Sequence, residues 1–447
     1  MEKSLILEII EEQAKMLKSL PAAYPRHALT ELQSAIKSRQ IVVITGIRRC
    51  GKSTLLQQIL KAHFNQKAFY FSFEDERLVH FTVDDFNVLH EALTEFYGEQ
   101  STFFLDEIQN IEHWELFVRR LHDRNLKIFI SGSNATLLSQ ELSTRLTGRT
   151  IPYTLYPFSF SEFIEFTIPD LKNKSPTTAT TRGAFSKAFT RYLKLGGMPL
   201  HVIEQERSFL IQLYENILYR DVISRYKLTD EKSIRELSLH LISHTASLYA
   251  YNKLKGMLHL GSMNTVKNYI QYLENCYLYF STKRFTYALK QQQLAPKKIY
   301  CIDSALIDAL SFKFSENYGH LLENTVFLEL KRRQQEVYYY HTQNNLEVDF
   351  IVRDGVKITQ LIQVCASLEK PETEAREINA LLEAMDETKL SHGFILTKDK
   401  SKIIKKENKT IRVLPVYQWL LTDPAERRAK QNMKVLTHSK HRMTQNK

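Results

Sequence analysis

The stretch of sequence that decides the fold is Gly46-Ile47-Arg48-Arg49-Cys50-Gly51-Lys52-Ser53. It has the pattern G-x-x-x-x-G-K-[ST], in which backbone N–H groups cradle phosphate oxygens, the lysine reaches the outer phosphates and the hydroxyl binds Mg²⁺. Residues 41–45 before it read as a buried strand, and residues 54–60 after it read as a helix. Such a strand–loop–helix directs N–H groups and the positive helix end at an anion. The sequence therefore predicts a phosphate-binding loop in an α/β fold, the alternative being a chance strand–turn–helix.

Each residue type in this loop has an expected part in binding ATP and Mg²⁺. Gly46 and Gly51 supply backbone freedom and close approach, Lys52 reaches the β- and γ-phosphates, and the Ser53 hydroxyl holds the metal. We expect the nucleotide to lie against the whole run, which comprises Gly46, Ile47, Arg48, Arg49, Cys50, Gly51, Lys52, Ser53 and the next residue, Thr54.

A second motif lies at residues 102–107, Thr-Phe-Phe-Leu-Asp-Glu. Four apolar or β-favouring residues followed by two acids predict a buried strand whose carboxyl end presents both carboxylates. We expect Asp106 to bind Mg²⁺, directly or through water, and Glu107 to orient and deprotonate the attacking water. The other interpretation is a surface strand end with two solvated acids. Residues 67–73 read as a further strand between the two motifs.

Further candidates follow the next predicted strand, residues 126–130. A polar side chain at that strand tip faces the same crevice, so we expect Asn134, or its neighbour Ser133, to contact the γ-phosphate or the water. Ordinary turn chemistry explains an Asn after Gly-Ser equally well. Arg145 and Arg149 come next, and an arginine aimed at the γ-phosphate raises the rate by about 10³–10⁵-fold. Arg149 is the catalytic candidate, although each arginine also fits a surface or salt-bridge role.

Composition indicates several globular domains. The 447 residues suffice for about three domains, with 43% hydrophobic and 25% charged residues. No apolar run approaches the ~18 residues of a membrane span, and acids interrupt residues 1–12, so a helix packed on the body is expected rather than a secretion signal. The cysteines have neither metal-ligand nor disulfide spacing; they are Cys50, Cys276, Cys301 and Cys365. These features predict a cytoplasmic protein with reduced thiols and no membrane partner.

The net charge of +11 is unevenly distributed. Residues 425–447 hold seven Lys/Arg against one acid, which leaves the other 424 residues at +5. The segment has little apolar content and reads as a disordered tail. It fits phosphate contacts with DNA or RNA, and it fits an inert, solubilising end equally well. Global charge is therefore weak evidence for nucleic-acid binding.

The middle of the chain reads as a helical segment followed by a winged helix-turn-helix. In the second part, helices are expected near residues 234–246 and 251–258, and a third follows Ser262 as its N-cap. The exposed face of that third helix carries residues suited to base and phosphate contacts, namely Asn264, Lys267, Asn268 and Gln271. A basic hairpin follows with Lys283, Arg284, Lys290 and Lys297, which suits phosphate contact. Winged helices also serve as protein-packing modules, so double-stranded DNA and protein both remain candidate partners.

From residue 319 the order helix, strand, strand, strand, helix, strand resembles the restriction-endonuclease-like fold of the PD-(D/E)xK type. Such nucleases hold a divalent metal with carboxylates and position water with a lysine. Glu323 and Asp349 fit two of the acidic places, but Gln363-Val364-Cys365 stands where Glu-x-Lys is expected. An amide weakens a metal site and a thiol does not replace an ammonium, which favours an inactive nuclease-like scaffold. Lys370, a few residues on, is the candidate replacement for the lysine.

Together these motifs resemble prokaryotic AAA+-type ATPases whose C-terminal half is catalogued largely as a domain of unknown function. The resemblance covers residues 25–420. Besides the two motifs above, it is carried by residues 132–134, 155–163, 196–199 and Tyr219-Arg220-Asp221-Val222. It implies an α/β fold with a parallel-sheet ATPase core, a possible homo-oligomer, and Arg220 as a sensor of nucleotide or of a neighbouring subunit, the alternative being a plain surface arginine. The expected divisions are 1–24 N-terminal helix, 25–156 P-loop core, 157–229 helical lid, 230–312 winged helix-turn-helix, 313–422 nuclease-like domain and 423–447 basic tail.

Three functions fit these features. The first is a Mg-dependent ATPase that acts as a DNA-associated switch or remodeller. The second is a metal-dependent DNA nuclease gated by ATP. The third is a scaffold or regulator that binds ATP without hydrolysing it and acts through protein contacts.

Overall fold

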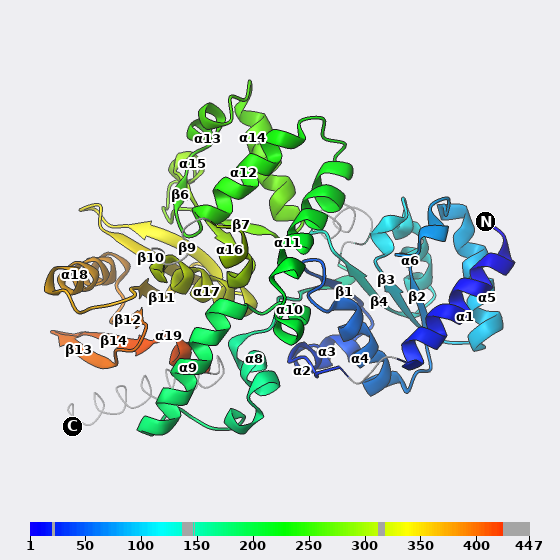
Figure 1. Cartoon of the computed structure of the whole chain (residues 1–447), viewed down its shortest axis with the longest axis horizontal. Helices are drawn as coiled ribbons and strands as arrows, with labels where there is room; N and C mark the ends of the chain where they lie inside the picture. Colours follow the sequence, from blue (N-terminus) through cyan, green and yellow to red (C-terminus); the bar gives the residue numbers. More distant parts are fainter. Residues whose placement is uncertain (20–22, 136–145, 147, 312–317, 423–447) are drawn as a thin grey trace, which may run out of the picture.

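The computed structural model describes residues 1–19, 23–135, 146, 148–311 and 318–422. Arg145 and the basic tail therefore lie outside the described residues. Figure 1 shows the units in chain order: a core unit in blue and cyan, a helical unit and a middle unit in green, and a C-terminal unit from yellow to orange.

The core unit is built on a parallel sheet, as the sequence predicts, and the sheet has a fifth strand that the sequence did not predict. Its strands lie in the order β2-β3-β4-β1-β5 and comprise β1 (Ile41–Thr45), β2 (Phe69–Ser72), β3 (Thr102–Asp106), β4 (Lys127–Gly132) and β5 (Thr150–Thr154). Strands β1 and β3 are wholly buried, which explains their nearly continuous apolar sequences. Because Thr45 pairs with Gly132 and Ser72 with Asp106, the carboxyl ends of four strands meet at one edge.

Helices cover both faces of this sheet. One face packs against α2 (Ala28–Glu31), α3 (Gln33–Lys37) and α4 (Lys52–Phe64), and the other against α1 (Lys3–Ser19), α5 (Phe86–Tyr97) and α6 (Trp114–Asp123). The N-terminal helix α1 buries Ile6, Ile9 and Ile10 at i, i+3, i+4 spacing and packs against α5 and β2. Short 3₁₀ turns complete the unit, namely η1 (Glu76–Leu78), η2 (Val83–Asp85) and η3 (Ile108–Asn110).

The helical unit follows the core. It comprises α8 (Phe160–Thr167), η5 (Pro169–Leu171), α9 (Ala179–Leu195), α10 (Pro199–Glu204), α11 (Arg207–Asn216) and η6 (Ile217–Ser224). The sequence predicts one helix from Phe209 to Tyr226, but the structure has an α-helix that continues as the π-helix η6. Periodicity alone does not separate these two windings over so short a stretch.

The middle unit contains the three helices expected from its sequence, together with a two-residue strand that the sequence did not predict. It consists of α12 (Glu231–Ser243), β6 (Leu248–Tyr249), α13 (Tyr251–Met257), α14 (Met263–Asn275), β7 (Tyr279–Thr282), α15 (Leu289–Leu294) and β8 (Lys297–Cys301), with the strands in the order β6-β8-β7. Ser262 caps α14 by accepting a hydrogen bond from the Asn264 N–H. The basic hairpin between β7 and β8 contains a short helix, α15, that the sequence did not predict, and α16 (Ser304–Leu310) follows β8.

The C-terminal unit holds a six-stranded mixed sheet. Its elements are α17 (Tyr318–Arg332), β9 (Glu336–His341), β10 (Glu347–Asp354), β11 (Lys357–Val364), α18 (Pro371–Thr388), β12 (His392–Thr397), β13 (Lys402–Lys406), β14 (Lys409–Pro415) and α19 (Val416–Leu420). The strand order is β13-β14-β12-β11-β10-β9. The predicted elements are present, and the terminal hairpin β13–β14 with α19 is additional.

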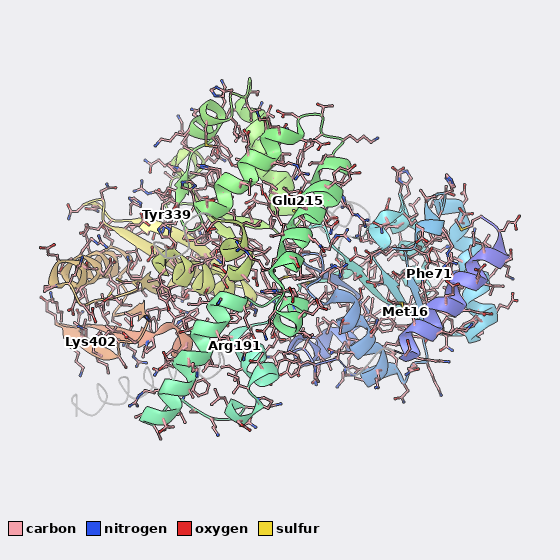
Figure 2. All side chains as sticks on the ribbon, in the orientation of Figure 1. Met16, Phe71, Arg191, Glu215, Tyr339 and Lys402 are labelled. Atoms are coloured by element: carbon pink, nitrogen blue, oxygen red, sulfur yellow. The ribbon has the colours of Figure 1, made fainter. Side chains whose placement is uncertain are left out.

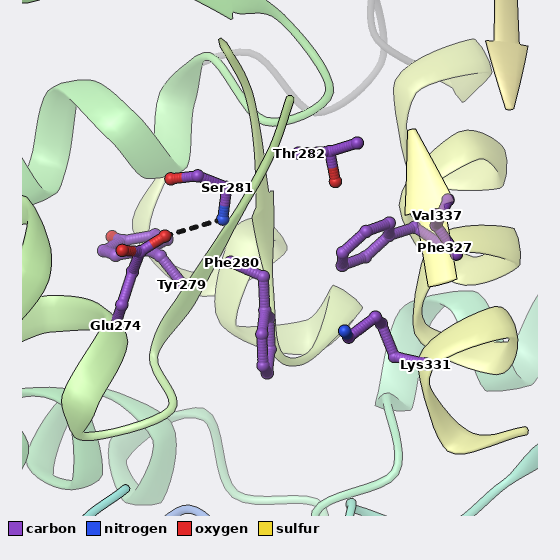
Figure 3. Close-up of a pocket in the computed structure, with 8 residues that line it drawn as sticks. All are labelled: Glu274, Tyr279, Phe280, Ser281, Thr282, Phe327, Lys331 and Val337. Atoms are coloured by element: carbon purple, nitrogen blue, oxygen red, sulfur yellow. Dashed lines mark hydrogen bonds between the residues drawn. The ribbon is translucent and has the colours of Figure 1, made fainter. Parts of the chain in front are cut away.

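Side chains from all four units pack together. Figure 2 shows the green helical and middle units, with Arg191 and Glu215, between the core, around Phe71, and the C-terminal unit, around Tyr339. One apolar cluster runs from α4 and β1 through α9, α11 and α14 to α17 and β11. A cavity of about 140 Å³ lies where β7 meets α17 and β9, with Phe280, Phe327 and Lys331 on its walls (Figure 3). None of the described helices has the length and apolar character needed to cross a lipid bilayer.

Candidate functional site

The phosphate loop connects β1 to α4, and its two glycines are required by its geometry. Gly46 has a φ of 151°, and a Cβ atom there would lie 2.2 Å from the Leu155 carbonyl oxygen. Gly51 precedes α4 with a φ of 99°. Both backbone conformations are ones that residues with side chains rarely adopt. Within the loop Ile47 and Cys50 are buried, whereas Arg49 is exposed. Ser53 and Thr54 lie in the first turn of α4.

Lys52 and Glu107 join the loop to the end of β3. The Lys52 ammonium lies 3.2 Å from Glu107 Oε1, and the two side chains are only 4% and 13% exposed. Glu107 Oε2 accepts hydrogen bonds from the Ser133 N–H, at 3.2 Å, and from the Gln109 side chain. The two sequence motifs and the end of β4 therefore meet at one place, as parallel strands with a common carboxyl edge require.

Asp106 lies beside this pair and fits a metal ligand. Its carboxylate accepts hydrogen bonds from Ser131 Oγ and from the Tyr70 hydroxyl at 3.2 Å, and Ser53 lies near enough to favour its ionised form. A carboxylate next to the hydroxyl of Ser53 is a hard oxygen donor set of the kind that Mg²⁺ prefers. Within the described residues no group of three or more His, Cys, Asp or Glu side chains could hold a metal by itself.

The ionisation of these residues follows from burial and from one another's charge. Burial alone would raise the pKa of Glu107, but the Lys52 charge and the hydrogen bonds outweigh it, and this pKa is lowered. The same ion pair outweighs burial at Lys52 and raises the pKa of its ammonium. Burial, followed by repulsion from Glu107, raises the pKa of Asp106. Glu107 is accordingly ionised near neutral pH and can accept a proton.

The structure brings some of the remaining candidates to this edge and not others. Ser133 and Asn134 are both buried directly after β4. Arg149 is not at the site: its carbonyl oxygen accepts the hydrogen bond of the Ile41 N–H, and its guanidinium pairs with Asp123 at 3.1 Å. Ile41 begins β1, so Arg149 lies at the opposite edge of the sheet. The expectation that it contacts the γ-phosphate of its own chain is therefore wrong, because Arg149 directly precedes β5, a parallel strand that the sequence did not predict, and so lies at the amino edge of the sheet.

Two contacts that the sequence did not predict bind the loop to later parts of the chain. Arg48 makes a bidentate pair with Asp221 of η6, with Nε–Oδ2 and Nη2–Oδ1 distances of 3.0 and 2.9 Å. The Tyr277 hydroxyl donates to Thr45 Oγ1 at 2.7 Å. Arg220, the expected sensor, is exposed, and its neighbour Asp221 is the residue that reaches the site. The run Tyr219-Arg220-Asp221-Val222 contains the residue that pairs with the loop. An acid beside an arginine, however, does not reveal a partner far away in sequence.

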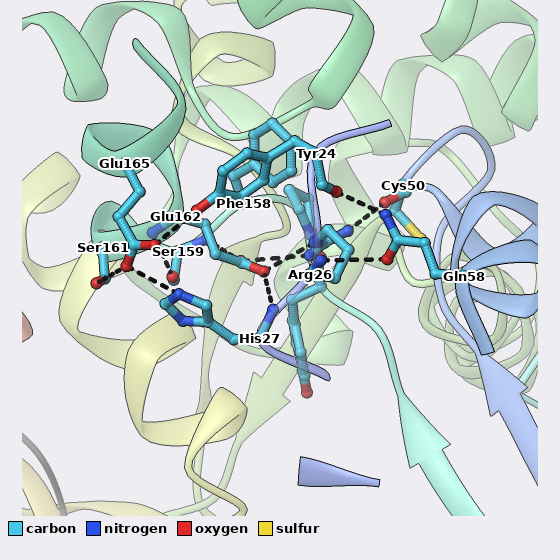
Figure 4. Close-up of polar contacts among 12 residues, drawn as sticks. Tyr24, Arg26, His27, Cys50, Gln58, Phe158, Ser159, Ser161, Glu162 and Glu165 are labelled. Atoms are coloured by element: carbon cyan, nitrogen blue, oxygen red, sulfur yellow. Dashed lines mark hydrogen bonds and ion pairs between the residues drawn. The ribbon is translucent and has the colours of Figure 1, made fainter. Parts of the chain in front are cut away.

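A third contact, made by Arg26, holds the backbone of the phosphate loop. The Arg26 guanidinium donates to the Cys50 carbonyl at 2.8 Å, to the Tyr156 carbonyl at 2.7 Å and to Glu162 at 2.8 Å (Figure 4). Glu162 belongs to the capping box that starts α8 with Ser159. Planar guanidinium groups suit such multiple acceptors. Arg26 thus ties the loop backbone to the start of the helical unit.

In the C-terminal unit an ammonium lies between the acids of the nuclease-like motif. Lys298 of β8 is 2.8 Å from Glu323 and 3.0 Å from Asp349, and it also pairs with Glu347. Gln363 hydrogen-bonds to the Asp349 N–H and to Glu377, so the amide is part of a closed network. The predicted replacement lysine, Lys370, is exposed and makes no ion pair with a described residue. Lys298 therefore occupies the position between the carboxylates, which weighs against a metal-dependent nuclease.

The parallel sheet, the glycine-dependent loop and the acids at the adjacent strand end define a P-loop nucleotide-binding protein. The AAA domain family model matches residues 38–164, and models of two domains of unknown function, DUF8612 and DUF4143, match residues 186–317 and 318–419. An uncharacterized protein of Methanocaldococcus jannaschii is 34% identical over 416 residues, covering 88% of this chain and 90% of its own.

An uncharacterized protein of Haemophilus influenzae is 30% identical over 363 residues, which cover 78% of this chain and 87% of its own. Among solved structures, a Signal Transduction ATPase with Numerous Domains from Pyrococcus horikoshii aligns with 70% of this chain and 46% of its own, at 15% identity and a TM-score of 0.29. The chain belongs to a family of AAA+-type P-loop ATPases that carry C-terminal domains of unknown function.

Proposed function

We propose that this protein binds ATP with Mg²⁺ at the loop Gly46–Ser53, hydrolyses it through Glu107, and couples the cycle to double-stranded DNA held by the middle unit. The observation that carries the proposal is the convergence of Lys52, Ser53, Asp106 and Glu107 at one sheet edge, with Lys52 and Glu107 in contact at 3.2 Å. Storage of nucleotide needs the loop, but it does not need a buried, ionised glutamate beside it.

In this mechanism each side chain has one task. Lys52 exchanges its contact with Glu107 for the β- and γ-phosphates, and loop N–H groups bind the phosphate oxygens. Glu107, released from the ammonium, accepts a proton from the water that attacks the γ-phosphorus, while ADP leaves with the electron pair of the broken P–O bond. Ser53 and Asp106 would hold Mg²⁺, which supplies neutralisation of the developing phosphate charge. Asn134 or Ser133 would hold the water or the γ-phosphate.

The charge of the middle unit supports a nucleic-acid partner. Residues 244–302 contain one acid, Glu274, and eight basic residues, namely Lys253, Lys255, Lys267, Lys283, Arg284, Lys290, Lys297 and Lys298. Of these eight, only Lys298 is in an ion pair with a described residue. The residues expected to contact DNA from α14, Asn264, Lys267, Asn268 and Gln271, are all exposed. A basic surface with an exposed polar helix face is typical of phosphate and base contacts.

ATP turnover with and without double-stranded DNA tests both parts. We expect Mg-dependent turnover in the wild type, loss of nucleotide binding in Lys52→Ala, and a fall of about 10²–10⁴-fold in Glu107→Gln with binding retained. Negligible turnover in a wild type that binds ATP, with or without DNA, contradicts hydrolysis.

The DNA part has its own matched comparison. The double variant Lys267→Gln/Lys283→Gln, from the middle unit, should bind duplex DNA more weakly, and the slope of its salt dependence should fall by about 0.9 for each phosphate that is no longer neutralised. The control Lys405→Gln/Lys406→Gln removes two exposed lysines from β13 and should leave DNA binding unchanged. Equal effects of the two pairs would contradict a DNA site on the middle unit.

A further inference from the structure

Arg48 of the phosphate loop is held by a residue far away in sequence. Its bidentate pair with Asp221 joins positions separated by 173 residues, and the Asp221 side chain is only 5% exposed. Among the described residues, Arg48 is the only ion-pair partner of Asp221. A bidentate guanidinium–carboxylate pair fixes geometry as well as charge. The loop is therefore anchored to η6 through the side chain of Arg48, which occupies one of the x positions of the loop motif.

Asp221 lies on an unusual element. The π-helix η6 runs over Ile217–Ser224 and buries Ile217, Leu218, Val222 and Ile223 alongside the aspartate. Regular α-helices seldom change to this wider winding, and where they do, a functional site is often present. The wider turn places the Asp221 carboxylate, which has apolar neighbours, against the loop. Apolar packing alone does not require a carboxylate at this position.

Arg48 also lies within the electrostatic influence of Glu107. Its Nη1 donates to Glu74 at 3.2 Å, and the hydrogen bond to Asp221, together with the charges of Asp221, Glu107 and Glu74, raises the pKa of its guanidinium. The γ-phosphate has to enter beside Lys52 and Glu107, and it brings more negative charge than one carboxylate. A phosphate that reached Arg48 would compete with Asp221 for the same guanidinium. A ligand that binds one of two arrangements better shifts the balance between them.

From η6 a series of contacts leads to α14 and returns to the sheet. Tyr226, just after η6, stacks on Tyr272 of α14 with ring centroids 3.7 Å apart, and its hydroxyl accepts a hydrogen bond from Asn275 at 2.9 Å. The Asn275 carbonyl accepts the Ala135 N–H at 2.7 Å, next to the end of β4. Helix α14, whose exposed face carries the residues expected to contact DNA, thus packs against Tyr226, just after the element that carries Asp221.

We propose that Asp221 is a positioning residue that holds Arg48 off the nucleotide, and that transfer of Arg48 from Asp221 to the γ-phosphate passes the occupancy of the site to α14. This rests on the proposed ATP binding at the loop. The competition makes an unusual prediction: removing a buried charge partner strengthens ligand binding, because Arg48 no longer has to leave a carboxylate.

Equilibrium binding of a non-hydrolysable ATP analogue tests the competition. Asp221→Asn should bind the analogue about tenfold more tightly than wild type, a change within the usual range of coupling between sites. Asp221→Glu, which keeps the charge, should stay near wild type. In an Arg48→Ala background, Asp221→Asn should have no further effect, because the aspartate acts only through the arginine. The control Glu215→Gln removes a surface ion pair between α11 and Arg235 of α12, and it should bind as wild type does.

Hydrogen exchange measures the transmission to α14. In the wild type the analogue should change exchange in residues 217–226 and 269–277, and Asp221→Asn should show the altered exchange without nucleotide. Arg48→Ala releases the same pair from the other side and should do likewise, so the test survives if one variant folds poorly. Equal or weaker analogue binding in Asp221→Asn, or an unchanged exchange pattern, overturns the proposal while ATP binding stands. If the wild type binds no analogue, the proposed function and this inference fail together.

Discussion

Glu107 combines a reactive carboxylate with a backbone conformation that is rare for its residue type. Its φ is 51°, in the left-handed region, and such a conformation costs about 1–3 kcal/mol unless the surroundings hold it. Here the Ser131 hydroxyl accepts the Glu107 N–H at 3.1 Å, and Ser133 and Lys52 fix the side chain. The sequence predicts an acid after β3, but only the structure shows how its direction is set.

Gly46→Ala tests the loop geometry at a single atom. The new Cβ would lie 2.2 Å from the carbonyl oxygen of Leu155, a buried residue directly after β5 whose backbone has no room to yield. We expect loss of ATP binding and destabilisation by more than about 1 kcal/mol. Gly183→Ala is the matched control, since nothing lies within 4 Å of its Cβ position on α9; it should be neutral or stabilise by up to about 1 kcal/mol. Calorimetry of ATP binding and thermal unfolding measures both, and retained binding in Gly46→Ala contradicts the geometry.

Glu162 should make the free energy of unfolding depend on pH in acid. Burial alone would raise its pKa, but the Arg26 charge and several hydrogen bonds lower it from 4.5 to about 2. A depressed carboxyl pKa stabilises the fold above the unfolded value, so this contribution is complete above about pH 4.5 and is lost as pH falls towards about 2. Chemical denaturation between pH 7 and 3 should show a steeper fall in wild type than in Glu162→Gln. Parallel pH profiles would show that the carboxylate does not carry this effect.

At the scale of elements, Lys298 connects β8 of the middle unit to α17 and β10 of the C-terminal unit. Removing one partner of a buried pair leaves the others uncompensated, which costs about 3–5 kcal/mol. Lys298→Met should therefore destabilise the protein strongly, and Glu323→Gln in the same chain should recover part of the loss. Burial and the neighbouring Asp349 raise the pKa of Glu323, and the Lys298 charge opposes them, so without Lys298 the Glu323 carboxylate is costly to keep buried and charged.

Denaturant unfolding of the single and double variants measures this coupling. Cleavage assays test the nuclease alternative, because the Lys298 ammonium competes with a metal for the place between the carboxylates. We expect no metal-dependent cleavage of duplex DNA by wild type. Cleavage that disappears in Asp349→Ala would show that the C-terminal unit is an active nuclease after all.

At the scale of the whole molecule, local patterns predicted the core and contacts distant in sequence escaped prediction. The loop, the strand ending at Asp106 and the strand before Ser131 are continuous stretches, and parallel pairing brings their ends together without further information. Arg48 with Asp221, and Lys298 with Glu323, join separate units, and neither partner has a local signature. Strand β13 is a lysine-rich sheet edge, so its alternation of apolar residues is weak.

The winged helix-turn-helix and the nuclease likeness stay predictions that the element order fits. The unit boundaries also stay predictions. Tyr277, just after α14, contacts β1, and α14 contacts Tyr226, so the middle unit is joined to both the core and the helical unit. If α14 binds DNA and its far end contacts the loop region, any effect of nucleotide on DNA affinity must be matched by an equal effect of DNA on nucleotide affinity. The ATP site and the DNA site would then be energetically coupled rather than independent.

The identity of the nucleotide that stays bound after incubation with Mg-ATP tests the central claim most directly. Wild type and Glu107→Gln are each incubated with Mg-ATP, separated rapidly from free nucleotide and denatured, and the released nucleotide is identified by chromatography. Because Glu107 is proposed as the base and Lys52 as the phosphate ligand, wild type should release ADP, Glu107→Gln should release ATP, and Lys52→Ala should release neither. The same ADP content in wild type and Glu107→Gln, or intact ATP in both, would contradict hydrolysis through Glu107.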